Sequence, residues 1–184
     1  MEPSIEQDFL TTATKRLKYY KDLGDKAMAQ IDPDGLFYSP GEESNSIAVV
    51  VQHMHGNMMS RWTNFLTEDG EKPWRQRDKE FENLPATREA ILEIWEEGWQ
   101  CLFGALNALK PSDLGKTVTI RQEPLTVIDA INRQLAHYPY HVGQIVYLAR
   151  MLKKQEWKSL SIPRGQSEQY NQSAEIKDPA SKFR

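Results

Sequence analysis

The stretch from Thr126 to Leu152 decides the fold, and it reads TVIDAINRQLAHYPYHVGQIVYLARML. Its apolar residues recur every three or four positions, which is the repeat of an amphipathic α-helix with one buried face. Thr126 is a suitable N-cap, and Asp129 stands three residues later, in the position of a capping box. The stretch therefore predicts a long helix whose apolar face other helices must cover.

Three upstream segments show the same periodicity. They span residues 5–31, 47–66 and 87–109. The Ser44–Ser46 cluster offers N-caps for the second segment. Turn-forming residues follow each segment, at Pro33–Gly35, Glu68–Gly70 and Pro111. Four amphipathic helices predict an all-α fold, a four-helix bundle around a common core.

The connection between the second and third helices is long. About twenty polar and irregular residues separate them, up to Pro85, whereas short helix connections have two to eight. A crossover of this length predicts that the two helices run parallel. Residues 117–120 alternate in the pattern of a short strand. We expect residues 1–157 to form one bundle domain and residues 158–184 to form an irregular tail.

The composition excludes several classes of protein. Apolar residues make up 39% of the chain and charged residues 27%, an ordinary balance for a soluble globular domain. The apolar runs are too short to cross a bilayer, so we expect no membrane partner. The net charge of −3 gives no basic stripe, so we expect no nucleic-acid partner. A single cysteine and an acidic start without an apolar leader predict a cytoplasmic protein.

All four histidines fall in the second and fourth predicted helices. His137 and His141 are four residues apart, so they are neighbours on one helix face and can share an ion. His53 lies beside the apolar stripe of the second helix, whereas His55 points to a different side. Imidazole binds zinc, nickel, copper or iron. On spacing alone, a metal site and ordinary hydrogen-bonded core histidines both remain open.

Two motifs add a family resemblance to this pattern. Residues 52–58 read QHMHGNM and residues 137–145 read HYPYHVGQI. Together with DGEKPWR at residues 69–75 and the segment 159–167, they resemble an uncharacterised branch of the DinB-like (DinB/YfiT) superfamily over most of the chain.

The resemblance implies a fold and a metal site. The implied fold is a four-helix bundle with a long crossover between its second and third helices. The implied metal ligands are His53, His137 and His141, holding a divalent transition metal, with zinc and nickel as the first choices. Three imidazoles leave one coordination position open, as in catalytic metal sites.

Further polar residues stand near the triad in the sequence. Asn57 and Arg61 follow His53 by one and two helical turns, where they would orient a ligand, bind a substrate, or form the polar edge of the helix, which we favour for Arg61. Gln144 follows His141 by three residues, as a hydrogen-bond partner for a metal-bound histidine or as a helix contact. Pro139 lies between the paired histidines and predicts a distortion there.

Three further residues are predicted to serve packing. Tyr138 and Tyr140 alternate with the histidines, so we expect them to face away as packing or interface residues. Cys101 is predicted to be a small buried hydrophobic residue rather than a nucleophile.

The resemblance implies a metal-dependent enzyme, a thiol-dependent S-transferase that acts on a small-molecule substrate with a low-molecular-weight thiol as co-substrate. Two alternatives remain: a metal-dependent hydrolase that activates water, and a non-catalytic metal-binding or dimerisation bundle. A homodimer is also expected by resemblance. A fourth protein ligand would favour the non-catalytic alternative, and an open position beside a pocket would favour an enzyme.

Overall fold

The helices begin at the cap residues that the sequence offers. In the computed structural model, which describes residues 3–82, 85–174 and 178–183, Ser46 Oγ accepts a hydrogen bond from the Val49 amide. Thr126 Oγ1 accepts one from the Asp129 amide in the same way. The four long helices are α1 (Ile5–Met28), α2 (Ile47–Trp62), α3 (Arg88–Ala108) and α4 (Val127–Lys153). Each ends within four residues of its predicted end, so the expectation of a mainly helical protein is confirmed.

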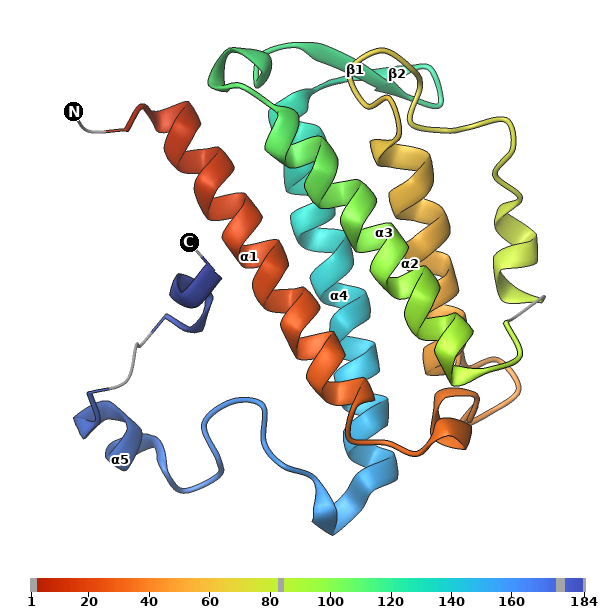
Figure 1. Cartoon of the computed structure of the whole chain (residues 1–184), viewed down its shortest axis with the longest axis vertical. Coiled ribbons are helices and arrows are strands. Elements are labelled where there is room, and N and C mark those ends of the chain that lie inside the picture. The colour runs from red at the N-terminus through yellow and green to blue at the C-terminus, as the bar shows by residue number, and fades with distance from the viewer. Residues whose placement is uncertain (1–2, 83–84, 175–177, 184) are drawn as a thin grey trace.

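The four helices pack side by side around one apolar core, with α1 next to α4 and α2 next to α3 (Figure 1). Successive contacts between α2 and α3 involve residues later in the sequence on both helices. His55 pairs with Glu97, and the Cys101 thiol is directed at the Met58 carbonyl one turn later on both helices. The two helices therefore run parallel, as the long connection between them requires.

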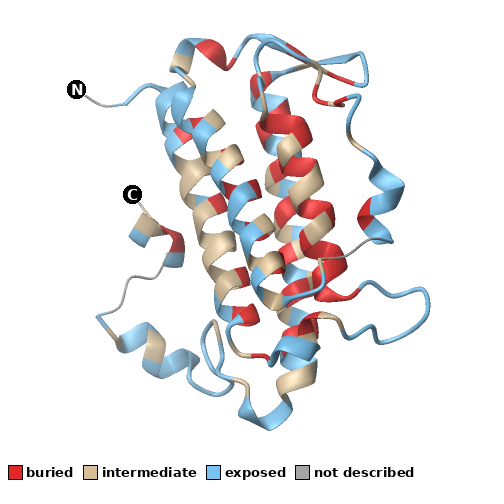
Figure 2. Ribbon diagram, turned by 45° about the vertical axis from the view of Figure 1, so that its right-hand side comes forward, coloured by how far each residue is buried: buried red, intermediate tan, exposed pale blue. Residues whose placement is uncertain are grey.

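Helix α2 is buried on nearly all sides (Figure 2). Its sequence, IAVVVQHMHGNMMSRW, is apolar around most of its circumference, which is typical of a helix in the interior. The outer side is covered by the connection, whose 3-10 helix Arg77–Phe81 lies against α2. Gln52 Nε2 donates hydrogen bonds to the carbonyl oxygens of Lys79 and Glu80, at 3.3 and 2.9 Å. The connection is thus a packed layer of the molecule.

A two-stranded antiparallel sheet caps one end of the helices. The strand predicted at β1 (Thr117–Ile120) is present, and it pairs with β2 (Glu123–Thr126), which the sequence did not predict. Arg121 and Gln122 form the turn between the strands, with φ angles of 56° and 66°. The Asp69 carboxylate accepts hydrogen bonds from both of their amides, at 2.8 and 2.7 Å. This carboxylate holds the hairpin against the start of the connection.

Helix α4 continues through Pro139 as one helix. Its first half presents His137 and its second half presents His141, and the two side chains remain on one face. The distortion expected at Pro139 therefore does not separate the paired histidines.

Among the described helices, none is both long and apolar enough to cross a membrane.

The chain beyond α4 returns to α1 (Figure 1). It contains a short helix, α5 (Ser167–Gln172), and a 3-10 helix, Pro179–Phe183, within the segment expected to be irregular. Lys182 Nζ pairs with Asp22 of α1 at 2.9 Å, and Ala180 is fully buried. The described end of the tail therefore packs on the outside of α1.

Candidate metal centre

Three histidines meet between α2 and α4. The imidazole of His53 lies 5.6 Å from that of His137 and 5.0 Å from that of His141, measured between ring centroids. One ring nitrogen of each residue lies within 4.8 Å of the other two. His55 does not join them, because its Nε2 is 2.8 Å from Glu97 on α3. The structure thus brings together the three histidines that the family resemblance implied.

Each of the three imidazoles is held by a different acceptor at its Nδ1 atom. This atom is 3.0 Å from Glu80 Oε2 in His53, 3.3 Å from Gln134 Oε1 in His137 and 2.9 Å from Gln144 Oε1 in His141. A carboxylate or amide oxygen only accepts hydrogen bonds, so each Nδ1 carries a hydrogen. In a neutral imidazole, Nε2 is then the atom with a free lone pair. The three rings are therefore oriented and protonated as metal ligands are.

The spacing of the Nε2 atoms favours a cation between them. The Nε2 atoms of His137 and His141 are 3.0 Å apart. With both Nδ1 atoms protonated, two lone pairs face each other at this distance. Zinc–nitrogen bonds of about 2.0–2.1 Å in a tetrahedral site place neighbouring nitrogens about 3.3 Å apart, close to the separation seen here.

Burial favours the neutral imidazole in His137 and His141. It lowers the pKa of His137 to about 3, and the nearby His141, His53 and Arg133 lower it in the same direction. Burial also lowers the pKa of His141, against the opposing effect of its bond to Gln144. A neutral imidazole binds a metal ion without first losing a proton, so both residues are available as ligands at neutral pH.

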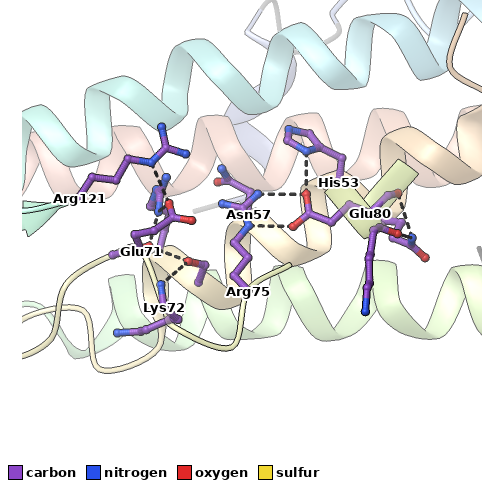
Figure 3. A network of polar contacts seen from close by, with 12 residues as sticks. His53, Asn57, Glu71, Lys72, Arg75, Glu80 and Arg121 are labelled. Atoms are coloured by element: carbon purple, nitrogen blue, oxygen red, sulfur yellow. Dashed lines mark hydrogen bonds and ion pairs between the residues drawn. The ribbon is translucent and has the colours of Figure 1, made fainter. Parts of the chain in front are cut away.

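The anchor of His53 comes from the connection between α2 and α3 (Figure 3). Arg75 binds Glu80 through two bonds, from Nε to Oε1 at 2.7 Å and from Nη2 to Oε2 at 3.1 Å. Burial raises the pKa of Glu80, but the bonds from His53 and Arg75 outweigh it and hold the pKa below its usual value. The carboxylate also packs directly over Gly56, where a Cβ atom would overlap it.

Asn57 is buried next to this group and connects it to the core. Its Oδ1 accepts a hydrogen bond from the Tyr138 hydroxyl at 3.0 Å, and that hydroxyl accepts one from Trp62 Nε1, also at 3.0 Å. Tyr138 is fully buried, so its predicted packing role is confirmed. Its hydroxyl also positions Asn57. Tyr140 faces solvent, with 63% of its surface exposed.

Two predictions need correction. Arg61 is not on a solvated polar edge, since only 6% of its surface is exposed. Its guanidinium donates hydrogen bonds to the Gly70 carbonyl and to Glu71 Oε2, because the connection folds back over this side of α2. Cys101 is only half-buried, and burial raises the pKa of its thiol.

A cavity of about 190 Å³ opens beside the histidines. His53 and His137 form part of its wall, and no aspartate or glutamate among the described residues does. The remaining lining residues are Asn57, Arg61, Arg75, Arg77, Arg121, Arg133 and Gln134. Within the described residues, no fourth histidine, cysteine or carboxylate joins the triad. The arrangement offers three ligands and an adjoining space for a small molecule.

A family model described as "Protein of unknown function (DUF1572)" matches residues 4–166. The chain belongs to the DUF1572 family. The match includes all four long helices and every residue of the candidate site, and it ends before α5. A search of curated proteins gives no match to this DUF1572 chain.

The fold of this DUF1572 chain is similar to that of a solved structure described as a conserved protein of locus from Enterococcus faecalis. The TM-score is 0.59 and the identity 13%, over 77% of this chain and 95% of that one. At this identity the likeness concerns the fold alone.

Sequence reasoning found part of the site in this DUF1572 chain. It named the three histidines, Asn57, Arg61 and Gln144. Asn57 and Arg61 line the cavity with His53 and His137, and Gln144 contacts His141. It missed Glu80, Arg75 and Gln134. Gln134 stands three residues before His137, the mirror image of the spacing that drew attention to Gln144, so the same search in the other direction would have found it. Glu80 is 27 positions from His53, and no local spacing connects them.

Proposed function

We propose that this protein is a metal-dependent enzyme in which His53, His137 and His141 hold a divalent transition metal, zinc or nickel. We further propose that it is a member of the DinB-like superfamily, that its helical body is the four-helix bundle of that superfamily, and that it transfers the sulfur of a low-molecular-weight thiol to a small electrophilic molecule. The observation that carries the metal site is the set of three Nδ1 contacts to Glu80, Gln134 and Gln144. They leave three Nε2 lone pairs directed into one small volume.

The cavity favours an enzyme over a non-catalytic metal protein. His53 and His137 line it, and the described residues supply no fourth ligand to close the coordination sphere. Glu80 is not available as a fourth metal ligand, since its two oxygens are hydrogen-bonded to His53 and Arg75. A divalent ion held by three imidazoles lowers the pKa of a bound thiol or water toward neutrality.

The residues that line the cavity favour a thiol over water as the nucleophile. Hydrolytic metal sites commonly use a carboxylate as general base, as in the His-Glu-x-x-His enzymes, and none of the described residues places a carboxylate in the wall of this cavity. Cys101 is not part of the wall, so the sulfur has to come from a second molecule. In the proposed step the thiol proton passes to solvent and a carbon–sulfur bond forms. With an alkyl halide, the halide departs with its bonding electrons. With an epoxide, the carbon–oxygen bond breaks and the ring oxygen takes up a proton, and with an enone the carbon next to the carbonyl takes up a proton.

The first test is metal content. Protein purified without a histidine tag and incubated with zinc or nickel is expected to retain about one equivalent by elemental mass spectrometry. His137→Ala should lose it, because two imidazoles bind far more weakly than three. His55→Ala is the matched control, since His55 lies on the same helix as His53 and pairs with Glu97 outside the triad. A wild-type protein that stays metal-free would contradict the proposal.

The second stage separates the two enzymatic activities. Metal-loaded protein is given a panel of small thiols with alkyl halide, epoxide and enone electrophiles. Turnover that requires the thiol and disappears in His137→Ala supports the transferase. Hydrolysis of esters or amides in the absence of thiol would instead support the hydrolase. Metal binding without turnover in either assay would leave a non-catalytic metal protein.

A further inference from the structure

The cavity beside the histidines concentrates positive charge in a protein whose net charge is negative. Its arginines come from four separate parts of the chain. Arg61 lies on α2, Arg75 and Arg77 on the connection, Arg121 on the hairpin turn and Arg133 on α4. The other described lining residues carry amide or imidazole groups.

Three of these arginines have internal partners. Arg75 is neutralised by Glu80 in a two-bond pair with only 2% of its side chain exposed. Arg61 and Arg121 share Glu71, at 3.1 and 3.2 Å (Figure 3). Burial lowers the pKa of Arg61, against the raising effect of Glu71. One carboxylate shared by two guanidinium groups leaves a net positive charge on this wall.

The other two arginines differ in their side-chain contacts. Across residues 3–82, 85–174 and 178–183, neither the Arg77 nor the Arg133 side chain has a hydrogen bond or ion pair. Both are exposed at the cavity. Arg133 is one helical turn before His137, and Arg77 is three residues before Glu80, the anchor of His53. Helix α4 therefore fixes the position of Arg133 relative to His137. The 3-10 helix fixes the position of Arg77 relative to Glu80, which contacts His53.

We propose that this cavity binds the oxyanion group of a small substrate, a carboxylate or a phosphate, through Arg77 and Arg133. Arg121 contributes to the positive electrostatic potential of the cavity. Guanidinium groups match planar and tetrahedral oxyanions, because they donate two parallel hydrogen bonds to them. The volume of about 190 Å³ is below the roughly 300–1,000 Å³ of drug-sized sites, so the substrate is small. The anion at the arginines holds the reacting part of the molecule against His53 and His137.

This inference rests on the proposed function, because it assigns the substrate class of the same site. The experiment is isothermal titration calorimetry of the full chain with succinate and with inorganic phosphate. Succinamide serves as the uncharged match of succinate. Each titration is run on chelator-treated protein and on zinc-loaded protein, because an anion that binds only the metal would show no heat in the former.

Saturable one-to-one binding of succinate or phosphate, without binding of succinamide, is expected in both forms. Arg77→Gln and Arg133→Gln should each weaken it about five- to tenfold, and added salt should weaken it further. Arg150→Gln, an exposed position on the same helix as Arg133, is the control and should bind as the wild type does. The relative response to succinate and phosphate distinguishes the two oxyanion classes.

Metal content measured on the same samples separates the two proposals. Normal zinc binding with no anion binding, or anion binding unchanged in both arginine variants, would overturn the substrate class and leave the metal centre standing. Anion binding that the arginine variants lose, in a protein that never retains metal, would support the anion site and overturn the proposed enzyme.

Discussion

His137 lies between α2 and α4 with two other imidazoles and Arg133 around it. In the folded protein burial and these neighbours lower its pKa to about 3, whereas an unperturbed histidine titrates near 6.5. Between these two pH values the unfolded chain binds a proton that the folded chain excludes. The contribution of His137 to stability is therefore fully present above about pH 6.5 and is lost as the pH falls toward 3.

The metal-free protein is accordingly expected to lose stability on acidification. From pH 7 to pH 5 the free energy of unfolding should fall by about 1 kcal/mol through His137, a value reduced for the partial exposure of the ring. His137→Asn should flatten this part of the profile, and His55→Ala should leave it unchanged. Urea denaturation at a series of pH values measures both. Parallel profiles for the wild type and His137→Asn would contradict the prediction.

At the scale of elements, the site depends on the contact between α2 and the 3-10 helix Arg77–Phe81. Gly56 makes this contact close enough, because its missing side chain leaves room for the Glu80 carboxylate. Arg75 and His53 hold that carboxylate from two sides, so it has little freedom to move away. The orientation of His53 thus depends on a residue that binds nothing itself.

Gly56→Ala is expected to weaken metal binding about tenfold or more. The new methyl group displaces Glu80, and loss of a histidine's hydrogen-bond partner typically costs 10- to 100-fold in metal affinity. Alanine favours a helix over glycine by about 1 kcal/mol, so the helix itself is not weakened. Gly104→Ala on α3 is the matched control, because apart from its own helix backbone and chain neighbours no described residue lies within 4 Å of the new Cβ. Competition titration with a zinc chelator compares the zinc affinities of the variants and the wild type. Equal affinities of Gly56→Ala and the wild type would contradict the prediction.

At the scale of the whole molecule, a buried polar chain joins the core to the site. It runs from Trp62 Nε1 through the Tyr138 hydroxyl to Asn57 Oδ1, and it connects α2 with α4. Tyr138 is central to it, since its hydroxyl accepts one bond and donates the other. Every atom in this chain has a partner, which is what makes its burial tolerable.

Tyr138→Phe should therefore destabilise the protein by about 2 kcal/mol. The substitution keeps the aromatic ring but leaves a buried indole N–H and a buried amide oxygen without partners, each a loss of roughly 1–3 kcal/mol at full burial. Tyr140→Phe removes the hydroxyl of the neighbouring exposed tyrosine and should change stability by less than about 0.5 kcal/mol. Urea denaturation of the two variants tests the contrast. Similar stability of both would show that the buried chain is energetically unimportant.

The helices could be predicted because their signals are local. Periodicity and the caps Ser46 and Thr126 act over three to four residues, and the His137–His141 pair has the same range. Strand β2 escaped prediction because its turn, Arg121–Gln122, lacks the glycine or asparagine usual at positive φ, and because Pro124 argues against a strand.

Contacts across the connection could not be predicted in this way. Asp69 supplies the stabilisation of the hairpin turn from 52 and 53 residues away in the sequence. Glu80 reaches His53 only when the connection lies along α2. Such pairs are fixed by tertiary packing, and no periodic pattern records which residue of a polar segment will face a given helix.

The distribution of the triad along the chain sets a time at which the proposed site can exist. During synthesis His53 emerges first, its anchor Glu80 follows, and His137 and His141 come only with α4. A nascent chain ending before α4 has one member of the triad with its anchor Glu80, and it lacks the other two histidines. If the proposed metal site exists, metal binding therefore requires α4, because an earlier fragment has only one of the three ligands.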